Sequence, residues 1–367
     1  MVLVSYLSWT TIFSQKNILD DPEIQQLVEN CLFSTYGYDF STAHELQGLL
    51  DSRMPQHPAP KFLAALIIYW ENFPLLPDDP ETVEFIALMD QSVDLAQEML
   101  SKNPESLEGI FFDLHSRAFK AMFWADNGKI AKVLTDLDNM YRQTLEGIRL
   151  KEKFDEFYFC SGMYNYYIEA YVEQHPGYKP ITALFRSGDK ELGLKELEFA
   201  ADHTTYIRYE SILFLSLLYL NYEHETDRAL DHAAELYNNF PENIYYTGQY
   251  LIILLYNSNF TIADLLVERI NFDESEFHRM ICLMTRAFIY ENRDKDYDTA
   301  LEFYKRTISS ADSFGEIAEL YSAIAHAGIA RIADQKNNPR EARKYRRQSR
   351  QLSGYDFILE YDPVDAR

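Results

Sequence analysis

A small residue recurs along the chain at a nearly constant spacing, and this repeat constrains the fold more than any other feature. Each copy has an aromatic residue or a glycine, then one or two variable residues, then an alanine or glycine within an apolar i, i+3, i+4 pattern. The eight small residues are Ala43, Ala96, Ala131, Gly193, Ala229, Ala263, Ala300 and Ala342. The spacing is 35 positions from Ala96 to Ala131, and 36, 34 and 37 over the steps from Gly193 to Ala300. A period of this length is typical of stacked repeats.

Between these positions the apolar residues follow a helical pattern. The segment 211–220 is too long and too free of Gly and Pro for a strand, and residues 229, 232, 233 and 236 share one helix face. The pattern predicts an all-α chain of about sixteen helices, two in each repeat. Each small residue should be buried where the two helices of a repeat touch, because Ala or Gly lets two helix axes approach closely. Neighbouring pairs should stack, with contacts only between adjacent repeats.

This pattern resembles the tetratricopeptide repeat (TPR) family, whose helix-turn-helix unit of about 34 residues carries a small residue in its second helix. The resemblance covers most of residues 22–350, although the Trp-x-x-Leu-Gly-x-x-Tyr phrase of the first helix is absent. The aromatic segment 154–171, the Pro-rich loop 175–180 and the phrase Gly-Asp-x-x-x-Gly-Leu at 188–194 are similar to a group of bacterial TPR proteins without assigned activity. The resemblance implies a right-handed α-α superhelix, a TPR-like solenoid of about eight helix pairs.

The chain divides into a short N-terminal segment and one long array. Residues 1–14 are apolar and uncharged, like the core of an export signal, but no basic residue precedes them. Two interpretations stay open: a removable signal that directs the protein to the periplasm or outside the cell, or a first helix that packs on the array of a cytoplasmic protein. Residues 15–367 form the predicted single array, with a longer aromatic-rich unit at about 132–193 and a basic C-terminal capping helix at about 339–352. No run reaches the roughly 18 apolar residues of a membrane-spanning helix, so we expect none in the mature chain.

Charge and motifs argue against several classes of function. The chain has 58 acidic and 34 basic residues, and its formal charge of −24 opposes binding to nucleic-acid phosphates. The three cysteines are far apart, which excludes a disulfide framework and the paired-cysteine metal and redox motifs. Two glycines at 188 and 193 have the spacing of a phosphate-binding loop, but Leu194 and Lys195 replace the Lys and Ser or Thr that it requires. We therefore predict no enzyme activity, no cofactor and no metal site.

Acidic clusters occur at 78–84 and 273–276. They could in principle supply the two carboxylates of a glycosidase. Acidic residues are also favoured in the first turn of a helix, and Pro80 is of the type that often begins one. We interpret both clusters as helix caps and solvated faces.

Two further groups of side chains are candidates for binding. The tyrosine cluster consists of Tyr158, Tyr164, Tyr166, Tyr167 and Tyr171. It either packs in the core or lines a groove for a peptide or glycan, because adjacent residues such as 166 and 167 must point to different faces of a helix. The arginine face consists of Arg343, Arg346, Arg347 and Arg350, at i, i+3, i+4 and i+7 of one helix. It either keeps the last repeat in solution or binds an anionic ligand.

These observations favour a non-enzymatic TPR scaffold that binds a protein or peptide partner on its concave surface. The alternative is an exported carbohydrate-binding or carbohydrate-active helical protein, which the excess of tyrosine and the export-like segment favour. Starch-binding outer-membrane lipoproteins have TPR-like helices, but they need a lipid-bearing cysteine directly after the signal. The first cysteine here is Cys31.

Overall fold

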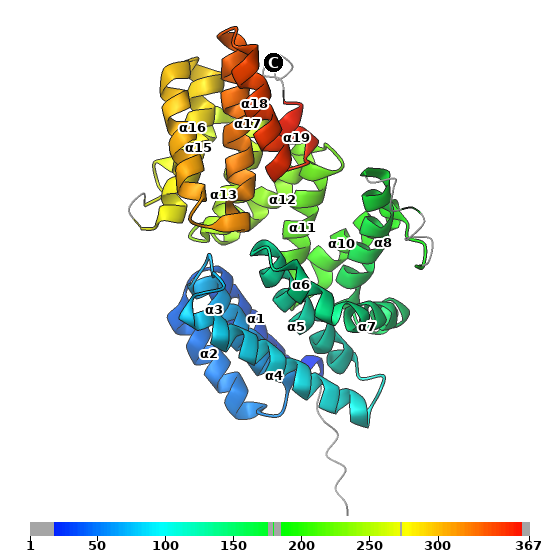
Figure 1. Cartoon of the computed structure of the whole chain (residues 1–367). Coiled ribbons are helices and arrows are strands. Elements are labelled where there is room, and N and C mark those ends of the chain that lie inside the picture. Colours follow the sequence, from blue (N-terminus) through cyan, green and yellow to red (C-terminus); the bar gives the residue numbers. More distant parts are fainter. Residues whose placement is uncertain (1–17, 175–178, 180–184, 272–273, 362–367) are drawn as a thin grey trace, which may run out of the picture.

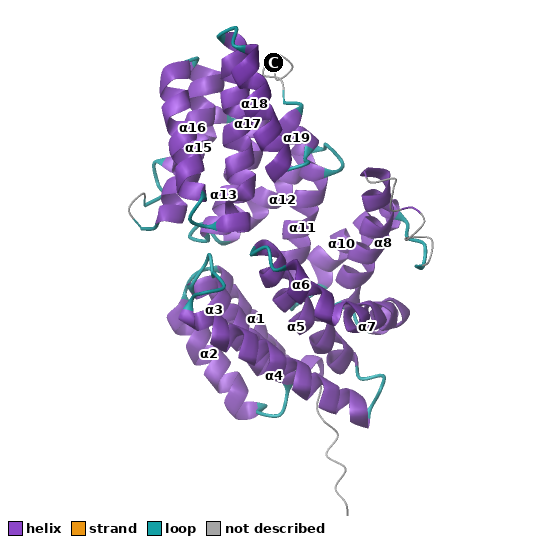
Figure 2. Cartoon of the chain, in the orientation of Figure 1, coloured by secondary structure: helices purple, strands orange, loops and turns teal. Residues whose placement is uncertain are grey.

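The computed structural model describes residues 18–174, 179, 185–271 and 274–361, and within these ranges it contains helices and no strand (Figures 1 and 2). The first part of the array comprises α1 (Pro22–Tyr36), α2 (Phe40–Arg53), α3 (Pro58–Glu71), α4 (Pro80–Lys102), α5 (Leu107–Asp126), α6 (Ile130–Val133), α7 (Leu137–Leu150) and α8 (Phe157–Gln174). The second part comprises α10 (Lys190–His203), α11 (Arg208–Asn221), α12 (Thr226–Asn239), α13 (Ile244–Tyr256), α14 (Phe260–Val267), α15 (Glu276–Ile289), α16 (Tyr297–Ala311), α17 (Glu319–Gln335), α18 (Pro339–Leu352) and α19 (Asp356–Leu359). Short 3-10 turns are η1 (Ile18–Asp20), η2 (Leu134–Asp136), η3 (Lys151–Lys153) and η6 (Gly315–Ala318), and η5 (Tyr290–Asp294) is a π-helical turn. The predicted all-α fold is confirmed.

Side chains that precede the helices explain where many of them begin. A side-chain acceptor at the N-cap binds free backbone N–H groups of the first turn at Asp21, Asp39, His57, Ser106, Asp189, Asn243, Ser275, Asp296 and Asn338. Each bond satisfies a donor that the helix itself cannot pair. The cluster at 78–84 lies where α4 begins, with Pro80 as its first residue. The phosphate-loop-like segment is likewise a cap, because the Asp189 carboxylate accepts the backbone N–H of Leu192 at 2.9 Å.

Each helix packs mainly against its neighbours along the chain, in pairs such as α1 with α2, α3 with α4, α8 with α10 and α17 with α18 (Figure 1). The small residues occupy the positions expected of them in these pairs. Six of the eight are alanines with no exposed surface: Ala43, Ala96, Ala229, Ala263, Ala300 and Ala342. A seventh, Gly193, is buried against α8, where an added Cβ would lie 2.6 Å from the Tyr166 nitrogen. Only a residue without a large side chain allows these close contacts.

Ala131 is the exception, because it is exposed on the four-residue helix α6, which buries none of its residues. The prediction of a buried small residue is therefore wrong at this copy of the repeat. The next helix, α7, takes the place against α5 and α8, and its close contact is made by Gly147, where an added Cβ would lie 2.8 Å from the Cys160 sulfur. The aromatic-rich region therefore contains short helices and turns between α5 and α8.

The array also closes on itself, which the expectation of contacts only between adjacent repeats did not allow. The Tyr36 ring at the end of α1 lies 5.3 Å from that of Tyr209, 5.8 Å from Phe240 and 6.1 Å from Tyr246. The Tyr36 carbonyl accepts a hydrogen bond from Asn243 Nδ2 at 3.2 Å. That expectation is wrong, because helices α1 and α3 pack against α11–α13 through large aromatic side chains.

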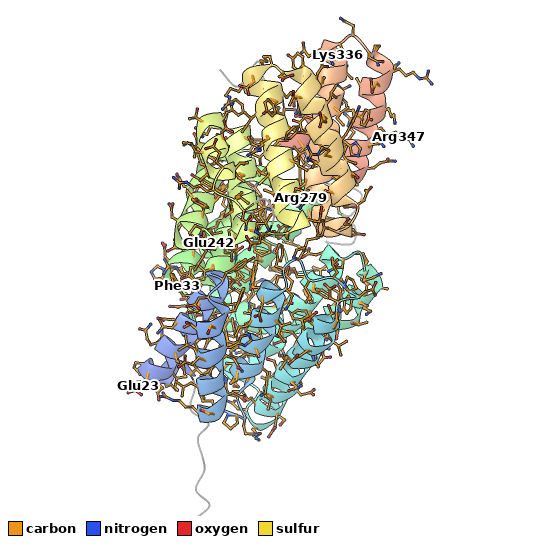
Figure 3. All side chains as sticks on the ribbon, turned by 90° about the vertical axis from the view of Figure 1, so that its left-hand side faces the viewer. Glu23, Phe33, Glu242, Arg279, Lys336 and Arg347 are labelled. Atoms are coloured by element: carbon orange, nitrogen blue, oxygen red, sulfur yellow. The ribbon has the colours of Figure 1, made fainter. Side chains whose placement is uncertain are left out.

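Figure 3 shows this junction from the side, with Phe33 of α1 near Glu242 at the start of α13. The Phe33 and Phe240 rings are 5.1 Å apart. Side-chain packing there extends inward to Trp70 of α3, whose ring lies 5.6 Å from Tyr246. The N-terminal helix pairs therefore pack against α11–α13 in the middle of the chain.

Candidate functional site

Closure of the array encloses a cavity of about 340 Å³ between segments that are far apart in sequence. Its walls come from α3, α5, α11, α13 and α17, together with η6, Leu352 at the end of α18, and Ser353 and Tyr355 after it. Helices α3, α11, α13 and α17 are each the first of a pair whose second helix carries the buried small residue. The cavity therefore lies on the side of the array opposite to those second helices.

One wall of the cavity is aromatic. The Trp70 and Phe73 rings stack at 5.4 Å, and Phe73 meets Tyr245 edge-on at 5.5 Å. The aromatic lining is completed by Tyr69, Phe119, Phe214, Tyr246, Tyr321 and Tyr355. Several of these rings are almost fully buried, so the half-buried rings of Phe73, Phe214, Tyr245 and Tyr355 present most of the aromatic surface to a bound group.

Four carboxylates line the same cavity, Asp126, Glu210, Glu316 and Glu319, and the lining contains no Lys, Arg or His. Within the described part of the chain, none of the four forms an ion pair. Burial, with the nearby Glu316 charge, raises the pKa of Asp126 to about 7. Burial also raises the pKa of Glu210 to about 7, against the opposing effect of a hydrogen bond from Tyr36. Asp126 and Glu210 are therefore about half protonated near neutral pH, and no Lys, Arg or His of the lining pairs with the negative charge that remains.

Four residues of the lining also carry buried polar atoms without a hydrogen-bond partner among the described residues. They are Trp70 Nε1, Glu210 Oε2, Gln249 Oε1 and the Tyr321 hydroxyl. Each side chain is at least nine-tenths buried. These atoms have almost no accessible surface, and the Tyr321 hydroxyl faces Gly248 of α13, where an added Cβ would lie 2.5 Å from it. Folded proteins leave few such atoms unpaired, and these four gather in the walls of one cavity.

The structure disperses the tyrosine cluster over several faces of α8. Tyr166 has no exposed surface and donates its hydroxyl hydrogen to Glu223. Tyr167 packs edge-on against Tyr166 and Tyr222, at 5.5 and 5.7 Å. These two tyrosines thus contact Tyr222 and Glu223, which directly follow α11.

The other three tyrosines lie elsewhere. The Tyr164 hydroxyl donates to the carbonyl of Arg186 at 2.7 Å, and the Tyr158 ring lies 4.3 Å from Phe199 of α10. Tyr171 is 40% exposed. None of the five lines the central cavity.

The arginine face lies on α18, which spans the range expected for it, but α19 follows before the chain leaves the described residues. Arg343, Arg347 and Arg350 are exposed, and Arg347 projects outward in Figure 3. Arg346 is instead half-buried and forms an ion pair with Asp334 of α17. The face therefore keeps three exposed cations.

Sequence reasoning missed the cavity residues because they come from four or more distant helices. Two signals were present: the adjacent aromatic pairs 69–70 and 245–246, and Glu210 next to the long apolar segment 211–220. A carboxylate in such a segment needs a partner when it is buried. Neither signal predicts that the aromatic pairs and Glu210 lie close together in the fold.

No family model matches this sequence, and no curated protein matches it. Within the described ranges there is no group of three or more His, Cys, Asp or Glu side chains placed to hold a metal ion. No described helix is both long and apolar enough to cross a bilayer.

Proposed function

We propose that the protein is a non-enzymatic helical-repeat scaffold that binds a segment of a partner protein or peptide in its central cavity. The observation that carries the proposal is the set of unpaired buried polar atoms at Trp70, Glu210, Gln249 and Tyr321 around one aromatic cavity. A bound peptide supplies both N–H donors and carbonyl acceptors, which such a set can pair.

The proposal includes the detailed architecture that the resemblance to TPR proteins implies. The array is a right-handed, TPR-like superhelix of about eight helix pairs, and its concave side faces the partner. Adjacent helix pairs and buried small residues in the second helices support this architecture. The tyrosine cluster and the arginine face are, in this proposal, packing and surface elements.

We also propose that the protein is exported, with residues 1–14 as the signal. This segment lies outside the described residues. The purified native protein should then begin near residue 15, and intact-mass measurement checks this. Recovery of the full-length chain from the cytoplasm of a host that processes bacterial signals would overturn it.

Site-specific photo-crosslinking tests the scaffold function. A photoreactive phenylalanine analogue replaces Phe214, which lines the cavity, or Leu265, which is 54% exposed on α14 outside it. We expect a protein or peptide partner to be captured at 214 and not at 265, and the capture to weaken in Asp126→Asn. Equal capture at both positions, or none, would contradict the proposal.

The same protein on a glycan array tests the carbohydrate alternative. The aromatic rings and carboxylates of the cavity are residue types that saccharide sites also use. Reproducible glycan binding that the Asp126→Asn change removes, with no protein captured at 214, would favour that alternative.

A further inference from the structure

We infer that the central cavity binds an organic cation, and that in the bound partner this cation is the ammonium or guanidinium group of a Lys or Arg side chain. The choice of a cation follows from the cavity alone. Only the source of that cation, a basic side chain of a partner segment, rests on the proposed function.

The charge of the cavity is the first argument. Asp126, Glu210, Glu316 and Glu319 bring up to four negative charges to one lining without a cationic residue. Carboxylates elsewhere in the described chain are often paired, as Glu291 is with Arg331 at 2.7 and 2.8 Å. A buried carboxylate is costly unless a positive or donor group satisfies it. Burial raises the pKa of Asp126 and Glu210 to about 7, so a cation that enters here takes the place of the protons that these two groups partly hold in the free protein.

The aromatic wall is the second argument. The Phe73 ring lies 5.4 Å from Trp70 and 5.5 Å from Tyr245, and all three rings line the same space. The faces of such rings attract ammonium and guanidinium groups, most strongly when water is excluded. Their apolar surface also suits the aliphatic stem of Lys or Arg.

The unpaired atoms are the third argument. Glu210 Oε2 and Gln249 Oε1 are acceptors that lack a donor, and a primary ammonium carries three N–H donors. Trp70 Nε1 can donate only, so it suits a carbonyl of the segment that carries the cation. One basic residue with its own backbone supplies both kinds of partner. Because the unpaired atoms have almost no accessible surface in the free protein, the Glu210 and Gln249 side chains must rotate toward the cavity to pair with it.

Other ligands fit less well. An anionic group would be repelled by the carboxylates, and a neutral saccharide would leave their charge uncompensated. A purely apolar side chain would satisfy the rings alone and leave the acceptors unpaired.

Binding of capped amino acids to the full chain tests the inference by calorimetry or ligand-observed NMR. The probes are Nα-acetyl-lysine amide and Nα-acetyl-arginine amide, with Nα-acetyl-norleucine amide and the Nε-acetylated lysine derivative as neutral controls of similar shape. We expect at least one basic probe to bind about tenfold or more tightly than its neutral counterpart. Equal binding of basic and neutral probes, or no basic probe binding at millimolar concentration, would overturn it.

Two variants connect the binding to the cavity. Asp126→Asn and Glu316→Gln each remove one lining charge, and Glu316 is exposed, so its replacement should leave the fold intact. Each should weaken the basic probe about threefold to tenfold. The matched control is Glu242→Gln, an exposed residue outside the cavity (Figure 3), which should leave binding unchanged. Equal weakening by Glu242→Gln would attribute the effect to net charge and overturn the assignment.

A further probe, n-butylammonium, distinguishes the two possible sources of the cation. If n-butylammonium binds as tightly as the lysine probe and no partner is captured at position 214, the cavity binds a small amine. That result would overturn both the assignment of the cation to a Lys or Arg side chain and the proposed function. If a partner is captured at 214 while neither basic probe binds, the proposed function stands and the cation is wrong.

Discussion

Tyr36, the last residue of α1, donates its phenolic hydrogen to the carboxylate of Glu210, which lies 174 positions further along the chain in the first turn of α11. Both side chains are buried. This bond joins the outer wall of the central cavity to the N-terminal helices, because Glu210 is also part of the cavity lining. The same carboxylate, Glu210, therefore contributes both to the stability of the closed array and to the lining of the cavity.

Tyr36→Phe should lower the free energy of unfolding by about 1–3 kcal/mol, since Glu210 then has two unpaired buried oxygens in place of one. Urea unfolding measures the change. Tyr237→Phe on α12 is the control, because that ring is only half-buried, and it should change stability by less than about 0.5 kcal/mol. Equal stability of both variants would show that the Tyr36 bond contributes nothing.

Ala229→Phe should destabilise the protein by about 1–3 kcal/mol, because Ala229 is fully buried and its carbonyl lies 3.2 Å from Ser216 Oγ of α11. Hydrogen exchange should rise in α11–α13 and also in α1, which packs on Phe240 at the end of α12. Ala131→Phe is the matched control at an exposed copy of the repeat and should change stability by less than about 0.5 kcal/mol. Unchanged exchange in α1 would argue that closure is weak.

Two glycine-to-alanine changes should have opposite signs. Gly193→Ala places a Cβ 2.6 Å from the Tyr166 nitrogen and 2.8 Å from the Gly162 carbonyl oxygen, so α8 and α10 must separate and stability should fall by about 1–3 kcal/mol. Gly48→Ala on α2 meets nothing within 4 Å and should add about 0.5–1 kcal/mol through helix propensity. Thermal unfolding of the two variants checks both signs, and a stabilising Gly193→Ala would refute the close helix contact.

The pH dependence of stability should carry a contribution from Glu210. Its pKa is about 7 in the folded protein against 4.5 as a model value, so the folded state holds the proton more tightly. The stabilisation is complete below pH 4.5 and is lost as the pH rises through 7. The difference in unfolding free energy between the wild type and Glu210→Gln should therefore shift by about 3 kcal/mol against the wild type from pH 4.5 to pH 8. Parallel pH profiles of the two proteins would contradict the raised pKa.

The local parts of this fold are predictable from the sequence, because they depend on residues close together in the chain. The helix over 228–239 and the burial of Ala229, Ala263 and Ala300 follow from apolar periodicity and from small residues at a fixed spacing. The failure at Ala131 has the same origin, because the local phrase matches the repeat although the helix there is four residues long and buries none of them. Apolar spacing over so few residues does not predict whether a neighbouring helix covers them.

The closure and the cavity were beyond such reasoning. The Tyr36 and Glu210 contact spans 174 positions, and no spacing rule relates residues so far apart. The aromatic pairs 69–70 and 245–246 look like ordinary core residues until α3 and α13 are placed side by side. The members of the tyrosine cluster are close in sequence, whereas the cavity residues are close only in space.

The contact between the N-terminal helices and α11–α13 also limits how this protein can evolve. An open solenoid can gain or lose a repeat anywhere, since each unit contacts only the next. Here an added or deleted helix pair between α3 and α11 would carry Tyr36 out of reach of Glu210 and Trp70 out of reach of Tyr246. The number of units in that stretch is consequently fixed. Units beyond α13 are restrained as well, because the Phe277 ring of α15 lies 5.5 Å from Phe73 and α17 lines the same cavity as α3.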